Sequence, residues 1–285
     1  MEKTNAIPTN FDFGGAMKPD YIVKCSYGND SIALLQYLHE RNQSKPLGKV
    51  VVLYNQTGWA AKWWEARVQN AEKNLLPKFG FIPARTKSIG MHNLIVQRNS
   101  WPNAMMKFCT EELKILPTHS WLNEHDPEGM AVMVCGVRRE ESARRSLWPE
   151  WVEGSDKNEG RPDWSPLVFH STEQRNTLIV KAGWEPLPHR SRECRCVLAN
   201  AKDLTTWTEE DISEIETIEA EMISRKANPE GKSDNQFMFK PASKKGNPQG
   251  IRAVVEWAKA VQAGRDERDL DLEPSGVCDS GFCGG

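Results

Sequence analysis

A short polar turn near the start of the chain carries the residue types best suited to holding an anion. The run that begins at Tyr21 is apolar and β-prone, and the apolar spacing from Ile32 to Leu38 predicts a helix. Backbone N–H groups and hydroxyls that meet where a helix begins can bind phosphate or sulfate. An ordinary strand–turn–helix capped by Asp30 or Ser31 is the alternative interpretation. The turn consists of Ser26, Tyr27, Gly28, Asn29, Asp30 and Ser31.

A cluster of arginines follows another predicted strand, Ala131 to Cys135. Guanidinium groups match phosphate and sulfate oxygens bidentately. A solvated charged loop is the alternative, but a position directly after a strand favours anion binding. We expect this cluster to face the sulfate or β-phosphate end of a nucleotide, together with Lys114. It consists of Arg138, Arg139, Arg144 and Arg145.

The seven cysteines are unevenly placed, which indicates metal or redox chemistry. Cys194 and Cys196 form one pair, and Cys278 and Cys283 form another at the C-terminus. If the C-terminal segment folds back, the four thiolates would bind an iron–sulfur cluster or a tetrahedral zinc ion. Alternatively, Cys278 or Cys283 is a catalytic nucleophile that attacks sulfur, and a second thiol resolves the product. A disordered tail with incidental thiols is the third interpretation.

The other three cysteines are predicted in different surroundings. Cys25 and Cys135 lie in predicted buried strands and are expected to be small core residues. Cys109 lies where a helix is predicted to begin, which would stabilise a thiolate, although core packing is the alternative.

Strands and helices that alternate along the chain must position these residues. Lys49 to Tyr54 reads as a buried strand, Asn55 to Gly58 as a turn and Trp59 to Leu76 as a helix. Two such units in succession predict an α/β fold with a doubly wound, mostly parallel sheet. Ligands of these sheets bind at the carboxyl ends of the strands, so Thr57 and Gly58 should share an edge with the first turn.

The remaining segments complete the predicted organisation. Thr110 is expected to cap a helix that Pro117 kinks, Leu147 to Trp164 to be an irregular loop, and Pro166 to His170 to be extended. Further helices are predicted up to Ala263. We divide the chain into an N-terminal arm (1–20), a nucleotide-binding domain (21–205), a helical C-terminal part (206–263) and a cysteine-bearing tail (264–285).

Composition restricts the classes of protein that fit. The 285 residues are 39% hydrophobic, enough for a sizeable core, and the net charge of −2 gives no general case for a nucleic-acid partner. No run has the length of a membrane helix, and no signal-peptide core precedes Gly15, so we expect a cytoplasmic protein without membrane contacts. The sequence does not indicate the oligomeric state.

Several segments agree in order and spacing with the motifs of one family. Ser26–Ser31 matches a Ser-Gly-Gly-x-Asp-Ser loop, and Gln56-Thr57-Gly58 matches Asp-Thr-Gly at the end of the second strand. Cys109–Pro117 matches Cys-Thr-x-x-Leu-Lys-x-x-Pro, and Gly136–Ser142 matches Gly-[Ile/Val]-Arg-x-x-[Glu/Gln]-Ser. On these motifs the chain resembles the phosphoadenylyl-sulfate (PAPS) reductase family of the PP-loop, adenine nucleotide alpha-hydrolase-like superfamily. Its layout is similar to the divergent, phage-type members.

The chain departs from this family at three places. Tyr27 replaces the first glycine of the loop, and Gln56 replaces an aspartate. The C-terminal Glu-Cys-Gly-Leu-His of the family's reductases is missing, and the tail carries Cys278 and Cys283 instead.

The resemblance implies a ligand, a cofactor and a partner. The ligand would be an adenine nucleotide (PAPS, adenylyl sulfate or ATP), the cofactor a [4Fe-4S] cluster in preference to zinc, and the partner a thiol-redox protein such as thioredoxin. The nucleotide-binding residues would be Ser26, Tyr27, Gly28, Asn29, Asp30, Ser31, Thr57, Gly58, Lys114, Gly136, Arg138, Arg139, Ser142 and Arg145.

Three functions remain open at this point. The first is a sulfonucleotide-reductase-like oxidoreductase, in which thiol attack on sulfur gives sulfite and an adenosine phosphate. The second is a PP-loop ATP pyrophosphatase that adenylates a nucleic-acid oxygen before sulfur transfer. The third is a nucleotide-binding protein without turnover, in which Tyr27 closes the loop and the cysteines hold a structural metal.

Overall fold

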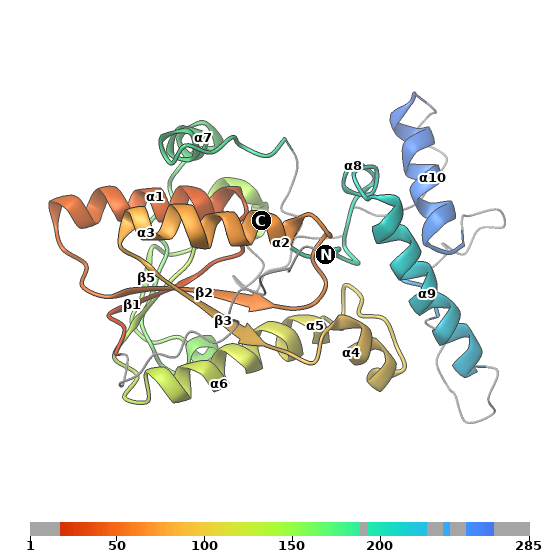
Figure 1. The fold of residues 1–285 in the computed structure, drawn as a ribbon, viewed down its shortest axis with the longest axis horizontal. Helices are drawn as coiled ribbons and strands as arrows, with labels where there is room; N and C mark the ends of the chain where they lie inside the picture. The colour runs from red at the N-terminus through yellow and green to blue at the C-terminus, as the bar shows by residue number, and fades with distance from the viewer. Residues whose placement is uncertain (1–17, 189–192, 227–235, 240–248, 265–285) are drawn as a thin grey trace, which may run out of the picture.

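A computed structural model of the chain describes residues 18–188, 193–226, 236–239 and 249–264. The predicted arm and tail therefore lie almost wholly outside the described residues, as do Cys278 and Cys283. Figure 1 shows a sheet between two layers of helices, with a helical C-terminal part beyond one end of the sheet. No helix in the described ranges is long and apolar enough to cross a membrane.

The sheet is mostly parallel, as predicted. Its six strands lie in the order β3-β2-β1-β4-β6-β5, and only the β5–β6 pair is antiparallel. Register pairs Ile22 with Val51 on one side and with Met133 on the other, so β1 has a neighbouring strand on both sides and its two middle residues are buried. The strands are β1 (Tyr21–Lys24), β2 (Val50–Gln56), β3 (Ile82–Lys87), β4 (Val132–Val134), β5 (Trp151–Val152) and β6 (Asp163–Trp164).

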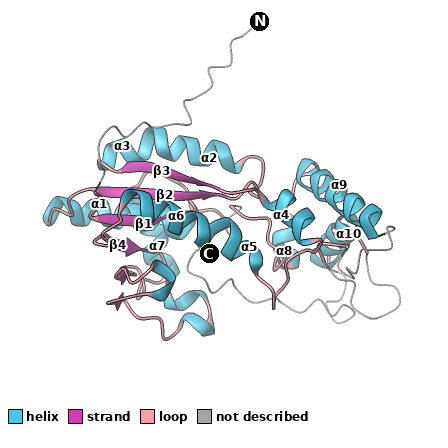
Figure 2. Ribbon diagram, turned by 90° about the horizontal axis from the view of Figure 1, so that it is seen from below, coloured by secondary structure: helices cyan, strands magenta, loops and turns pink. Residues whose placement is uncertain are grey.

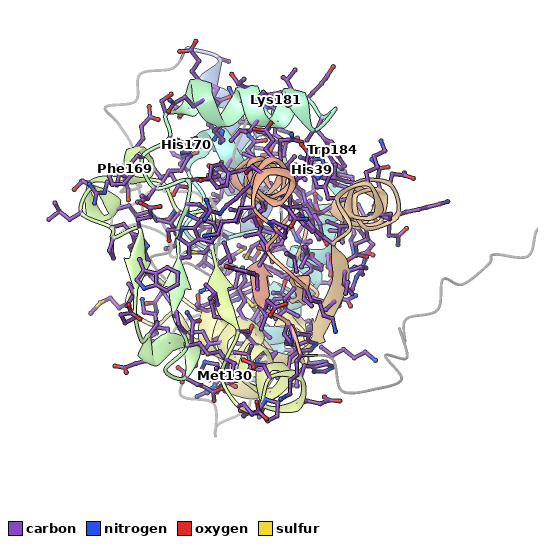
Figure 3. The ribbon with its side chains drawn as sticks, turned by 90° about the vertical axis from the view of Figure 1, so that its left-hand side faces the viewer. His39, Met130, Phe169, His170, Lys181 and Trp184 are labelled. Atoms are coloured by element: carbon purple, nitrogen blue, oxygen red, sulfur yellow. The ribbon has the colours of Figure 1, made fainter. Side chains whose placement is uncertain are left out.

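Helices cover both faces of the sheet (Figures 1 and 2). On one face α1 and α2 pack on Val23 and Val52, and on the other α6 packs on Ile22 and Val51. In Figure 3, His39 marks α1 and Lys181 marks α7, which lie side by side. The helices are α1 (Asn29–Ser44), α2 (Trp64–Asn70), α3 (Leu76–Phe79), α4 (Met91–Arg98), α5 (Phe108–Thr110), α6 (Leu116–His125), α7 (Thr172–Lys181), α8 (Ala201–Leu204), α9 (Glu209–Lys226) and α10 (Ile251–Gln262), with short 3₁₀ turns at Arg139–Glu141, Ala143–Arg145 and Asp156–Asn158.

Two of the long helical stretches contain a π-helical turn just before a proline. Ala71–Leu75 precedes Pro77, and Glu111–Ile115 precedes Pro117. Proline lacks an N–H and its ring crowds the carbonyl four residues earlier, so a wider turn accommodates it. The helix at Pro117 therefore continues through a π turn.

Three local predictions were wrong. Thr110 is not a helix cap, because the helix already begins at Phe108 and Lys107 precedes it. Leu147–Trp164 contains β5 and β6, which form the antiparallel edge of the sheet. The segment from Pro166 to Phe169 forms turns instead of an extended piece.

The C-terminal helices form a second core at the carboxyl end of the sheet. Ile215 on α9 and Val254 on α10 pack with Trp59, Ile95 and Trp101, which follow strands of the first domain. Figure 1 shows β2 and β3 pointing towards these helices. The loops that follow the parallel strands therefore lie between the sheet and the C-terminal part.

Candidate functional site

The turn after β1 forms a loop whose N–H groups are available at the start of α1. Gly28 is the N-cap of α1, and no side chain caps this 16-residue helix. The Ser26 and Ser31 hydroxyl oxygens lie 3.2 Å apart, the Ser31 oxygen accepts the Ser26 N–H, and the Ser26 oxygen accepts the Gly28 N–H. Uncapped N–H groups and the positive end of the helix dipole favour a bound anion here.

Tyr27 adopts a left-handed backbone conformation with a φ of 58°. A left-handed conformation costs a residue with a side chain about 1–2 kcal/mol, which explains why glycine suits this position. The ring compensates by burial, since it is fully buried, packs 5.7 Å from Tyr54 and donates its hydroxyl to Glu72. In the third function left open by the sequence Tyr27 closes the loop, whereas its ring lies in the hydrophobic core.

Asn29 and Asp30 bind neighbouring segments. The Asn29 amide exchanges two hydrogen bonds with the backbone of Leu187, at 3.0 and 2.9 Å. The Asp30 carboxylate accepts a hydrogen bond from Arg138, and both side chains are buried. Burial and then the Glu141 carboxylate raise the pKa of Asp30, Arg138 and Arg175 oppose the shift, and the resulting pKa is about 6.

Gly136 allows the loop after β4 to approach α1 closely. A Cβ on this residue would lie 3.1 Å from the backbone oxygen of Asp30. The Gly136–Ser142 motif therefore lies against the first turn of α1. Ser142 carries a buried hydroxyl that has no hydrogen-bond partner in the described part of the chain.

The arginine cluster does not converge on one open anion site. Arg138 contacts Asp30 and Glu140, and Arg145 contacts Glu141. Arg139 donates to the Trp148 carbonyl and lies 4.5 Å from the centre of the Phe169 ring. These three side chains hold the loop after β4 in place, whereas we had expected all four to face an anion; the side chain of Arg144 is outside the described residues.

The turn after β2 connects the sheet to the late cysteine loop. Thr57 is buried, and its hydroxyl accepts the Trp59 N–H at 3.2 Å. The Trp59 indole donates to the Arg195 carbonyl, and the Arg195 N–H donates to the Trp59 carbonyl. The Arg195 guanidinium lies 4.3 Å over the Trp59 ring and pairs with Glu214 on α9. Gly58 has a φ of 65° and a close backbone neighbour in Gly90.

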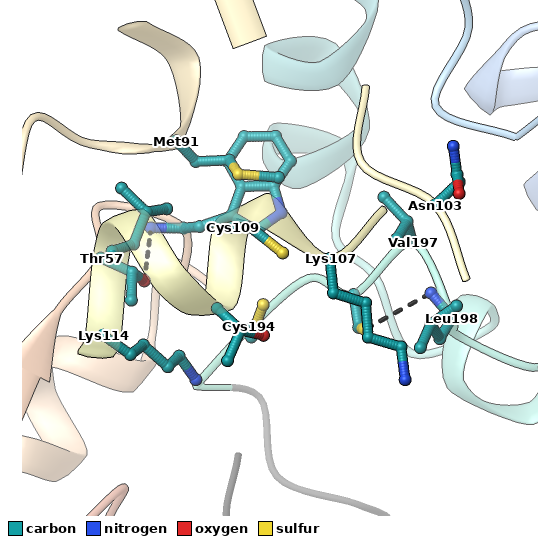
Figure 4. Close-up of a pocket in the computed structure, with 13 residues that line it drawn as sticks. Thr57, Met91, Asn103, Lys107, Cys109, Lys114, Cys194, Val197 and Leu198 are labelled. Carbon is teal, nitrogen blue, oxygen red and sulfur yellow. Dashed lines mark hydrogen bonds between the residues drawn. The ribbon is translucent and has the colours of Figure 1, made fainter. Parts of the chain in front are cut away.

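Three cysteines line one cavity beside this turn (Figure 4). Cys109 comes from the start of α5, and Cys194 and Cys196 from the late loop; Figure 4 shows the Cys109 and Cys194 sulfurs facing the same space. The enclosed space is about 30 Å³, so a group larger than about one water would also occupy the open mouth. The metal set predicted from the sequence paired Cys194 and Cys196 with the tail cysteines and omitted Cys109.

Charged groups surround the thiols. Lys114 lines the cavity and forms a buried ion pair of 2.8 Å with Glu193. A hydrogen bond with Cys196, and then burial, raise the pKa of Cys194 well above its usual value. This thiol is therefore protonated at neutral pH unless a metal or a substrate displaces its proton.

The described residues contain no group of three or more His, Cys, Asp or Glu side chains arranged for a metal ion.

The other cysteines lie elsewhere. Cys25 and Cys135 are buried in the core, as predicted, and burial raises the pKa of Cys25 to about 12 and of Cys135 to about 11. The two tail cysteines, proposed as nucleophiles or ligands, lie outside the described residues.

Comparison with known proteins decides the family. The model of the phosphoadenosine phosphosulfate reductase domain matches residues 20–215, which is more than half of the chain. The chain belongs to this family. The phosphoadenosine phosphosulfate reductase domain thus includes the phosphate loop, the three-thiol cavity and the first turns of α9. Membership supports nucleotide-linked sulfur chemistry as the general activity.

Solved structures provide distant likenesses. A phosphate complex of PAPS reductase from Candida auris is 13% identical, with a TM-score of 0.43, over 59% of this chain and 75% of that chain. The U34-tRNA thiolase NcsA from Methanococcus maripaludis, with its [4Fe-4S] cluster, is 11% identical, with a TM-score of 0.43, over 94% and 81%. FMN adenylyltransferase from Candida glabrata, in complex with FAD and pyrophosphate, is 12% identical, with a TM-score of 0.40, over 58% of this chain and half of that one. No curated protein matches the sequence.

Proposed function

We propose that this chain binds the phosphates of an adenine nucleotide at the Ser26–Ser31 loop and carries out thiol-dependent sulfur chemistry at the three-thiol cavity. One observation supports this proposal above all. Leu187 contacts Asn29 in the Ser26–Ser31 loop and Arg195 contacts Trp59 after β2, so Cys194 and Cys196 lie at the same carboxyl edge of the sheet as that loop. Ligands of doubly wound sheets bind along this edge.

Within this proposal, the reaction is the reduction of a sulfonucleotide. A cysteine thiolate attacks the sulfur, the S–O bond to the phosphate breaks, and the adenosine phosphate leaves with the bonding electrons. The cysteine then carries an S-sulfonate. A second thiolate attacks the cysteine sulfur, sulfite leaves, and a disulfide forms that a thioredoxin-like dithiol reduces. Cys278 and Cys283 are candidates for both thiols, and the cavity cysteines are alternatives.

The cofactor that we propose is a [4Fe-4S] cluster, although the described residues hold no preformed group of three metal ligands. Each iron of such a cluster takes one thiolate, so ligands spread around a cavity fit a cluster better than a single zinc ion. Cys109, Cys194 and Cys196 would hold it, with Cys278 or Cys283 as a fourth ligand. When bound, the cluster would lie beside Lys114, and this lysine would supply the positive charge near a sulfate group.

A second function rests on a specific departure from the family. Because the tail lacks Glu-Cys-Gly-Leu-His, the chain is also a candidate ATP pyrophosphatase that activates an acceptor oxygen for sulfur transfer. The phosphate loop would then hold the β- and γ-phosphates, and the cavity thiols would serve sulfur delivery.

Product analysis distinguishes these functions. Anaerobic protein with a dithiol reductant is incubated separately with PAPS, adenylyl sulfate and ATP, and sulfite, adenosine phosphates and pyrophosphate are quantified. Sulfite from a sulfonucleotide supports the first function, and pyrophosphate from ATP supports the second. Tight binding without any product would contradict both and favour a binding protein that holds a structural metal.

A further inference from the structure

Helix α2 contacts the phosphate loop through two side-chain donors. The Trp64 indole donates to the Ser26 carbonyl at 3.1 Å, and the Arg67 Nε–H donates to the Tyr27 carbonyl at 2.8 Å. Neither residue belongs to a motif that marks the nucleotide site in the sequence. Both hydrogen bonds end on backbone carbonyl groups of the loop.

These two bonds fix the orientation of two successive peptide groups. In a trans peptide the C=O and the next N–H point in opposite directions. The Tyr27 and Gly28 N–H groups are therefore turned away from α2, towards the side of the loop where a concavity can bind an anion. The Gly28 N–H donates to the Ser26 hydroxyl oxygen at 3.3 Å, so the orientation of this peptide group also positions that hydroxyl. Tyr27 needs such support, because its φ of 58° is unfavourable for a residue with a side chain.

In the part of the chain that the structure describes, Arg67 is held by aromatic rings and has no carboxylate partner. Its guanidinium lies 4.6 Å from the centre of the Trp184 ring, labelled in Figure 3, and 5.5 Å from that of Trp64. The Nη2 atom is buried without a hydrogen-bond partner in the described ranges. Burial lowers the pKa of Arg67 to about 10, which still leaves the group charged at neutral pH. Within the described residues, this side chain thus donates its hydrogen bond to the Tyr27 carbonyl.

We propose that Arg67 is a positioning residue for nucleotide phosphates, which acts by holding the Tyr27 carbonyl and, through the Gly28 N–H, the Ser26 hydroxyl in the loop conformation that binds the ligand. This inference rests on the proposed function, because it assumes that phosphates bind at Ser26–Ser31. It assigns a role in the site to a residue in the middle of α2.

Two substitutions test the hydrogen bond apart from the charge. Gln places its Nε2 donor at the same distance along the side chain as the Arg67 Nε, whereas Met places a methyl group there. Binding of inorganic pyrophosphate and of ATP is measured by calorimetry for the wild type, Arg67→Gln and Arg67→Met, with thermal unfolding of each variant. Arg41→Met is the matched control, because Arg41 also lies over a tryptophan, Trp164, at the opposite end of α1 from the loop.

We expect Arg67→Met to weaken pyrophosphate and ATP binding by about tenfold or more, and Arg67→Gln and Arg41→Met to stay near the wild type. Equal binding by Arg67→Met and the wild type would overturn the inference and leave the proposed function intact. Equal losses in Arg67→Gln and Arg67→Met would also overturn it, since the charge would then matter more than the bond. A wild-type protein that binds neither ligand would contradict the proposed function as well.

Discussion

The Arg138 guanidinium donates to the Asp30 carboxylate and so joins the loop after β4 to the first turn of α1. Both side chains are almost fully buried, and Gly136 brings the two backbones close enough for the contact. The pair holds together two of the motifs on which the family resemblance rests. We therefore assign Arg138 and Asp30 first to the architecture of the site.

Removing one member of this pair should be costly. Arg138→Met leaves a buried carboxylate whose next cation, Arg175, lies 3.8 Å away. We expect a loss of about 3–5 kcal/mol in the free energy of unfolding, measured with urea. The double variant Asp30→Asn/Arg138→Met should recover part of this loss, because no buried charge remains unpaired. If the single variant loses under 1 kcal/mol, the pair is not important for the fold.

Asp30 should also give the stability a pH dependence. The pKa of Asp30 is raised from its ordinary 3.8 to about 6, so the folded protein holds this proton more tightly than the unfolded chain. The contribution of this tighter proton binding to the free energy of unfolding is therefore fully present below pH 3.8 and is lost as the pH rises through about 6. Arg138, Arg175 and Glu141 are the charged groups that act on it.

Asp30→Asn isolates this contribution. Urea unfolding is measured for the wild type and the variant at several pH values between 4 and 6. As the pH rises, the free energy of unfolding of the wild type should fall relative to that of the variant. An unchanged difference across this range would mean that Asp30 titrates normally in the folded state.

Tyr27 allows a test of the left-handed conformation. Both Tyr27→Ala and Tyr27→Gly remove the buried ring and its contacts with Tyr54 and Glu72. Glycine adopts a φ of 58° without penalty, so we expect Tyr27→Gly to be more stable than Tyr27→Ala by about 1–2 kcal/mol. Thermal and urea unfolding measure the difference. The opposite order would show that this backbone conformation is not required.

If the cavity thiols bind a [4Fe-4S] cluster, the purified protein should contain iron and sulfide. Protein purified without oxygen should be brown and contain iron and sulfide, and Cys109→Ser or Cys194→Ser should lose both. Cys25→Ser is the control, because Cys25 is buried in the core away from the cavity. Cys283→Ser tests the fourth ligand. Colourless protein with zinc would indicate a structural metal, and protein without any metal would contradict the cofactor assignment.

The sequence was sufficient to predict the main β–turn–α units, including the turn Ser26–Ser31 at the start of α1. Long apolar runs such as Lys49–Tyr54 and turn residues such as Gly28 determine these elements locally. The strands β5 and β6 were missed because each has two residues, which is too short for any periodicity. They form because β6 pairs with β4 and β5 pairs with β6, which is a tertiary effect.

The roles of charged and thiol residues depended on partners that are distant in the sequence. A run of arginines does not indicate whether carboxylates neutralise it, and Arg138 finds its partner on α1. Cys109 joins Cys194 and Cys196 only because the late loop packs on the turn after β2. Arg67 has no signal in the sequence, since its contact is to a backbone carbonyl.

The central claim is that the phosphate loop and the three-thiol cavity form one site, and thiol labelling tests it most directly. Metal-free, reduced protein is treated with iodoacetamide in the presence and absence of PAPS or ATP, and each cysteine is quantified by mass spectrometry. We predict that the nucleotide slows labelling of Cys109, Cys194 and Cys196, while Cys25 stays unlabelled in both samples. Unchanged labelling of all three cavity cysteines, at a nucleotide concentration shown by calorimetry to saturate the protein, would contradict the claim.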